Sequence, residues 1–65
     1  MEGWKNWEGK NIFLKTKSDR CYSGKVVEVD ENDKLNGIIF LTIVDKFDKR
    51  VTFVTSEIVL IQEEN

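Results

Sequence analysis

The sequence predicts a mainly all-β domain, in which a short N-terminal helix precedes a strongly bent, five-stranded antiparallel barrel. The 65 residues include 7 Val, 6 Ile and 4 Thr, whose stiff β-branched side chains favour strands. Alanine, the best helix former, is absent. We expect a single domain over residues 1–65, with a core that supplies no more than about 3–5 kcal/mol. Self-association is the common route to further stability in such a short chain.

The segment 1–9 is expected to form the only helix or helical turn, which caps the barrel. Trp4 and Trp7 stand three residues apart, so they share one face of a helical turn. Gly9 is suited to ending that turn. Two roles are open for the tryptophans: they cover the core, or they form a platform on which nucleic-acid bases stack.

Two strands are expected to form the first hairpin, at 10–17 and 20–30. Ile12, Leu14 and Thr16 recur at every second position, which is typical of a half-buried strand. Ser18-Asp19 favours a tight turn. Gly24, inside the second strand, indicates a bulge or a sharp bend at a barrel corner. The second strand is therefore expected to change its buried face along its length.

The rest of the barrel is predicted from apolar stretches separated by polar breaks. The stretch 38–45 is apolar on both faces, which is typical of a central strand that is covered on both sides. The expected elements of residues 10–62 are completed by a loop at 30–37, a turn at 46–49, strands at 50–55 and 58–62, a break at 56–57 and a solvated tail at 63–65.

Composition excludes several classes of protein. With 10 basic and 12 acidic residues the net charge is −2, which does not fit binding of nucleic acid through bulk positive charge. No apolar run approaches the roughly 18–20 residues of a membrane span, so no membrane partner is expected. The first residues lack the apolar region of a signal peptide, and the only cysteine is Cys21, so we expect a cytoplasmic protein.

No catalytic or metal-binding constellation is found in the sequence. Histidine is absent, so Cys21 has no histidine base to activate it as a nucleophile. Asp30 and Asn32 match the first two ligand positions of a calcium loop, but Lys34 occupies the third. The four glycines are scattered, which excludes a glycine-rich phosphate loop. We therefore expect no enzyme, no cofactor and no metal ion.

Two groups of basic residues are candidates for ligand binding. The first flanks the first hairpin and the second flanks the 46–49 turn around Phe47. A basic patch beside an exposed aromatic residue is typical of single-stranded RNA binding. Plain surface charge is the alternative, because Asp19, Asp45 and Asp48 lie in the same turns. The members are Lys15, Lys17, Arg20 and Lys25 in the first group, and Lys46, Lys49 and Arg50 in the second.

The order of these features resembles the Sm-like family of small β-barrels over residues 4–62. Tyr22-Ser23-Gly24 matches that family's aromatic-x-Gly, and Ser18-Asp19-Arg20 stands where the family usually has Asp-Gly-Arg. Asp30 and Leu35-Asn36 match its RNA-facing loop with two extra residues. Thr55-Ser56 replaces the Arg-Gly that the family commonly has before the last strand. SH3-like protein-interaction modules share the same five-strand plan, so that fold stays open as the alternative.

The resemblance implies a homo-oligomeric ring of about five to seven subunits that binds single-stranded RNA. It implies that Asn36 contacts base edges, that Lys34 and Leu35 line the same loop, that Asp30 orients this loop, and that Thr55 lies at the pore. A second, lateral site would use the basic hairpin residues Lys15, Lys17 and Arg20. Subunits would pair through strand edges that carry six apolar side chains: Val51, Phe53, Val54, Ile58, Val59 and Ile61.

Overall fold

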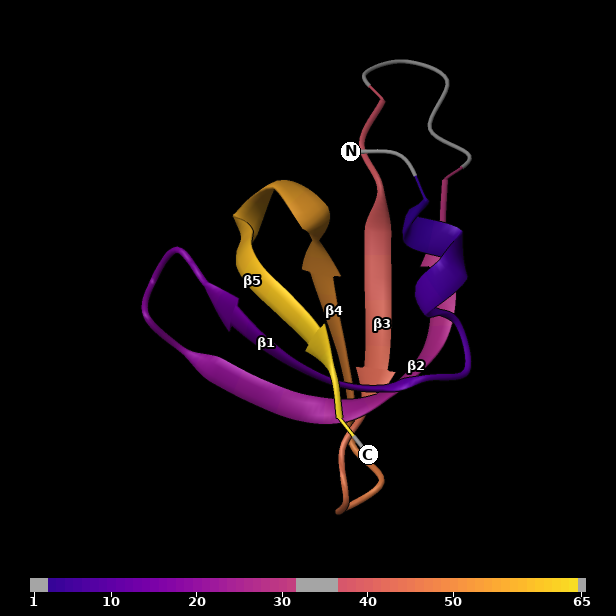
Figure 1. The fold of residues 1–65 in the computed structure, drawn as a ribbon, viewed down its shortest axis with the longest axis vertical. Coiled ribbons are helices and arrows are strands. Elements are labelled where there is room, and N and C mark those ends of the chain that lie inside the picture. Colours follow the sequence, from indigo (N-terminus) through magenta and orange to yellow (C-terminus); the bar gives the residue numbers. More distant parts are fainter. Residues whose placement is uncertain (1–2, 32–36, 65) are drawn as a thin grey trace.

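The computed structural model describes residues 3–31 and 37–64. The chain folds into five antiparallel strands in one sheet and two short 3-10 turns (Figure 1). The expected mainly β fold is therefore confirmed. In chain order the elements are η1 (Trp4–Trp7), β1 (Asn11–Thr16), β2 (Cys21–Asp30), β3 (Phe40–Val44), β4 (Arg50–Val54), η2 (Thr55–Glu57) and β5 (Ile58–Glu63).

The sheet is curled but open. Its strand order is β4-β3-β2-β1-β5, so β4 and β5 lie at its two edges (Figure 1). The prediction of a barrel needs correction in this respect, because within the described residues β4 and β5 do not pair with each other. The three residues of η2 are all that connects these two strands along the chain. Among the described residues, the outer edges of β4 and β5 therefore have no strand partner.

The N-terminal helix is a single 3-10 turn. It begins after Gly3, whose φ of 93° is the left-handed conformation that glycine adopts most easily. The turn ends early because the backbone joins the sheet: the Gly9 N–H donates to the Val26 carbonyl, 2.8 Å away. Trp4 is buried in the core, and Trp7 is half-buried against it. Of the two expected roles, Trp4 therefore has the first: it covers the core.

The bend expected in the second strand is present. β2 is 10 residues long, and its register against β3 shifts between Val26 and Glu28, which leaves Val27 as a bulge. Val26 and Val29 are buried while Val27 and Glu28 are exposed, so the buried face changes as predicted. A Cβ on Gly24 would lie 2.5 Å from the Val44 carbonyl oxygen. Glycine at this position allows β2 to fold closely over the end of β3.

The core lies inside the curve of the sheet. β1 buries alternate side chains as predicted, with Ile12, Leu14 and Thr16 turned inward. β3 is an inner strand but is covered on both faces only at its centre, since Phe40 is 39% exposed at its start. The buried apolar side chains are Trp4, Ile12, Leu14, Val26, Val29, Leu41, Ile43 and Phe53.

β5 is one residue longer than predicted, and it contains a bulge that was not predicted. It extends to Glu63, whose carboxylate pairs with Lys10 at 3.8 Å, so the solvated tail begins one residue later than expected. Its register against β1 shifts at Lys15/Thr16, because Leu60 faces Lys15 while Ile58 faces Thr16. Val59 is therefore an extra, bulged residue on an edge strand.

Candidate nucleic-acid and subunit interfaces

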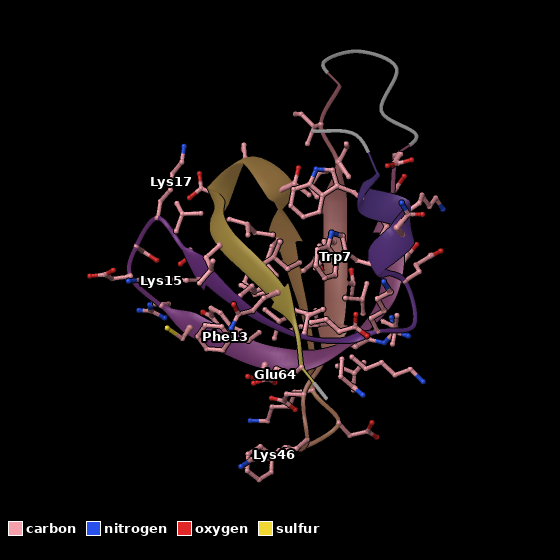
Figure 2. All side chains as sticks on the ribbon, in the orientation of Figure 1. Trp7, Phe13, Lys15, Lys17, Lys46 and Glu64 are labelled. Atoms are coloured by element: carbon pink, nitrogen blue, oxygen red, sulfur yellow. The ribbon has the colours of Figure 1, made fainter. Side chains whose placement is uncertain are left out.

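The first hairpin places basic side chains at one end of the molecule. Figure 2 shows Lys15 and Lys17 extending from this hairpin at the left of the view. Lys15 pairs with Asp19 at 3.2 Å, whereas neither Lys17 nor Arg20 forms an ion pair within the described residues. The Lys17 N–H donates to the Glu57 carbonyl at 2.8 Å, which fixes the hairpin against η2. Two cations are therefore free to meet an anionic ligand.

A shallow groove of about 430 Å³ lies beside the hairpin. Arg20 and Glu57 line it with opposite charges, and the hydroxyl-bearing Ser18, Tyr22 and Thr52 line it as well. Such a surface offers several hydrogen-bonding groups around one guanidinium, which suits a base edge, whereas the Glu57 carboxylate repels a phosphate. Lys25, which the sequence grouped with this hairpin, lines a different groove.

The residues expected at the pore are described in part. Asp30, the last residue of β2, pairs with Phe40, and Phe40 pairs with Val54, the residue before Thr55. The Thr55 N–H donates to the Ile39 carbonyl at 2.9 Å. Asp30 and Thr55 therefore lie at the same end of the sheet. The other three expected residues, Lys34, Leu35 and Asn36, lie outside the described residues.

Most of the expected interface residues lie on the two free edges. On β5, Val59 is 57% and Leu60 is 43% exposed, which are high values for apolar side chains on one strand. Phe53 differs, because its side chain is buried in the core and its ring meets the Tyr22 ring edge-on at 4.8 Å. It can contribute to an interface only through its backbone. The half-buried members of the expected set are Val51, Val54, Ile58 and Ile61.

The turn between β3 and β4 presents an aromatic side chain that the sequence placed in a basic group. Phe47 is 70% exposed, and the Lys46 ammonium lies 5.4 Å from the centre of its ring. The Asp45 carboxylate accepts hydrogen bonds from the Phe47 and Lys49 N–H groups at 2.8 and 3.0 Å. This pattern holds the turn in one shape. In Figure 1 the turn projects beyond the sheet at the end where the chain terminates.

A groove of about 890 Å³ runs from this turn to the bend of β2. Tyr22, Val27 and Phe47 contribute apolar surface to it, and Val27 is 39% exposed. The sequence did not predict this groove, because it forms only when the bend of β2 approaches the end of β3. The exposed position of Phe47 within a charged turn was the available signal.

Neither a metal site nor a membrane span emerges from the part of the chain that the structure describes. Among residues 3–31 and 37–64 no three His, Cys, Asp or Glu side chains are grouped so that they could hold a metal ion. Neither helical turn in these residues has the length and apolar character to cross a bilayer. No family model matches the chain, and no curated protein or solved structure is significantly similar to it. Function must therefore be argued from the surfaces themselves.

Proposed function

We propose that the protein is a homo-oligomeric, non-catalytic module that binds single-stranded RNA in the cytoplasm. The single observation that carries this proposal is the open sheet, with free edges on β4 and β5. An unpaired edge exposes a row of N–H and C=O groups that another strand can satisfy. Two such edges on one subunit allow a head-to-tail contact, and repetition of that contact closes a ring if the rotation permits.

Charge favours one orientation of the two edges. Lys49 and Arg50 lie at the start of β4, whereas Glu63 and Glu64 lie at the end of β5. An antiparallel contact puts these opposite charges side by side, and it continues the antiparallel pairing of the whole sheet. A parallel contact would instead place Glu63 and Glu64 near the end of β4 and Glu57, where like charges repel. We therefore propose antiparallel pairing between subunits.

RNA binding is supported by the first hairpin. Lys17 and Arg20 carry positive charges with no ion-pair partner among the described residues, on a chain whose net charge is −2. Local charge of this kind attracts phosphates even where the overall charge does not. A ring would repeat the hairpin in every subunit, and avidity would then offset weak binding at one copy. Asp30 and Thr55 would contribute to a second, pore-type contact with Lys34, Leu35 and Asn36.

The assembly is tested by placing charge on the exposed edge. In the variant Val59→Lys/Leu60→Lys, both replaced side chains are largely exposed, so the fold should survive while edge pairing is lost. We expect light scattering after size exclusion to give about five to seven times the monomer mass for the wild type. At protein concentrations low enough for the wild type to have that mass, the variant should fall at least about fivefold below it.

Asn6→Lys is the matched control for this experiment. Asn6 is exposed on η1, which packs against the middle strand β2, and the substitution adds positive charge of the same kind. Its mass should equal that of the wild type. A wild type that stays monomeric at every concentration would refute the ring, and so would an edge variant that keeps the wild-type mass.

RNA binding is tested by its salt dependence. Each cation that neutralises a phosphate of a single strand should contribute about 0.7 to the slope of log K against log [salt]. For Lys17→Ala/Arg20→Ala we expect weaker binding to oligo-U and oligo-A, with a slope lower by about 1.4. Fluorescence anisotropy over a salt series measures both quantities.

Lys5→Ala is the control for the RNA experiment, since Lys5 is a cation on η1 that already faces Glu8 at 3.9 Å. It should leave the slope unchanged. Undetectable binding to either oligonucleotide, or binding that is insensitive to salt, would contradict the RNA proposal. It would favour the alternative, an SH3-like module that binds a protein partner at a strand edge.

A further inference from the structure

We propose that the groove beside Phe47 is a second, two-fold interface, in which two copies of the chain insert Phe47 into each other's groove. This contact is centred on Phe47 and not on the strand edges, although Glu64, at the end of β5, borders both. A two-fold contact needs a surface that is complementary to itself, because each residue that acts on one copy acts equally on the other. The groove meets that requirement in shape and in charge.

The shape provides both a projection and a recess. Phe47 is 70% exposed in the turn between β3 and β4. This turn projects beyond the sheet (Figure 1). The groove of about 890 Å³ lies directly beside it and presents Tyr22 and Val27. A buried aromatic anchor that fills a pocket on the partner is the usual centre of a stable interface. The hydrogen bonds of Asp45 hold the turn in place, so little ordering is needed on binding.

The charges favour a second copy over a nucleic acid. Lys25 and Lys46 line the groove, but so do Asp48 and Glu64. A phosphate backbone would be attracted by the first pair and repelled by the second. A second copy turned by a two-fold axis brings the lysines of each groove to the carboxylates of the other, so both signs are used. Of these contacts the exchange between Lys46 and Asp48 is the one a variant can test.

The small area of one groove contact means that it would be strengthened by a ring formed through the strand edges. A stable interface buries about 800 Å² on each partner, and a single groove with one aromatic anchor is smaller than that. One pair of grooves should therefore bind weakly. If the subunits form a ring, several grooves act at once, and two rings would associate through their combined strength. This joint action rests on the proposed function, whereas the contact itself does not.

The test compares solution masses of variants over a range of protein concentrations. We expect Phe47→Ser to lower the largest mass about twofold, because it removes the anchor from both copies. Lys46→Glu and Asp48→Lys should each lower it as well, since each leaves like charges face to face. The combined variant Lys46→Glu/Asp48→Lys should recover the wild-type mass, because the exchange restores complementarity. Far-UV circular dichroism checks that each variant keeps the fold.

The edge variant Val59→Lys/Leu60→Lys separates this contact from the ring. At high concentration it should form dimers, and addition of Phe47→Ser should convert these to monomers. If the ring proposal fails but the groove proposal holds, the wild type will itself be a dimer that Phe47→Ser dissociates. If the groove proposal fails, Phe47→Ser will leave every mass unchanged. Loss of RNA affinity in Phe47→Ser with an unchanged mass would assign the groove to nucleic acid instead.

Cys21 gives an independent readout. It lines the same groove and is an exposed free thiol. If two copies cover the groove, its reaction with a thiol reagent should slow as the protein concentration rises. In Phe47→Ser the rate should not depend on concentration. A concentration-independent rate in the wild type would overturn the two-fold contact.

Discussion

Gly24→Ala is expected to lower the free energy of unfolding markedly. The added Cβ would lie 2.5 Å from the Val44 carbonyl oxygen and 3.0 Å from the Val44 carbonyl carbon. Both are backbone atoms, so the clash can be relieved only if β2 moves away from β3. Overpacking of this kind costs about 1–3 kcal/mol. The core supplies no more than about 3–5 kcal/mol, so a substantial part of the stability would be lost.

Urea unfolding followed by tryptophan fluorescence measures this loss. Ser23→Ala is the matched control, because Ser23 precedes Gly24 on β2 and its side chain is exposed. It should unfold within about 0.5 kcal/mol of the wild type. Gly9→Ala is a second control, which tests backbone strain without a steric clash. Gly9 has a φ of 84°, but no atom lies within 4 Å of an added Cβ. If Gly24→Ala were as stable as Ser23→Ala, the close approach of β2 and β3 would be wrong.

Trp4→Ala is expected to be the most destabilising change on η1. The Trp4 side chain is 8% exposed and packs into the core, and truncation of a buried tryptophan costs about 3–5 kcal/mol. A loss of that size equals the whole stability expected of a single chain. We therefore expect Trp4→Ala to be unfolded as a monomer at 25 °C, which far-UV circular dichroism and the loss of a cooperative thermal transition would report.

Trp7→Ala is the matched comparison for Trp4→Ala. Trp7 stands on the same turn, but it is only half-buried and has the Lys10 ammonium 5.7 Å from its ring. Its truncation should cost less, in the usual range of about 0.5–3 kcal/mol, and leave a cooperative transition. Equal losses for the two variants would contradict the separate positions of their side chains. A folded Trp4→Ala variant with weakened RNA binding would support the stacking role instead.

Local patterns in the sequence were sufficient to predict the strands. Ile12, Leu14 and Thr16 alternate because one face of β1 is buried, and this two-residue period survives in the fold. Gly24 signalled the bend because only a residue without Cβ fits so close to Val44. A short helix or turn was expected within residues 1–9, and it lies at Trp4–Trp7. The hydrogen bond from Gly9 to Val26 is a long-range contact that no local pattern encodes.

The surfaces were less accessible to prediction than the strands. The sequence treated Lys15, Lys17 and Arg20 alike, but pairing with Asp19 distinguishes Lys15 from the other two. Phe53 was expected at a subunit contact, yet the open sheet turns its side chain inward. The groove at Phe47 joins β2 to the β3–β4 turn, segments some twenty residues apart, and depends on how sharply β2 bends. Such properties follow from tertiary geometry.

The bulge at Val59 would limit the size of an assembly that forms by strand addition between copies of the chain. In the proposed assembly every added subunit would leave the same two edges unsatisfied, so pairing alone would not limit its size. Flat, regular edges stack into fibrils without end, whereas a bulge bends its strand and increases the local twist. In the proposed ring each new subunit would therefore join at an angle, and the accumulated angle would return the last edge to the first. An irregularity of one residue would in this way protect an apolar edge strand from amyloid-like growth.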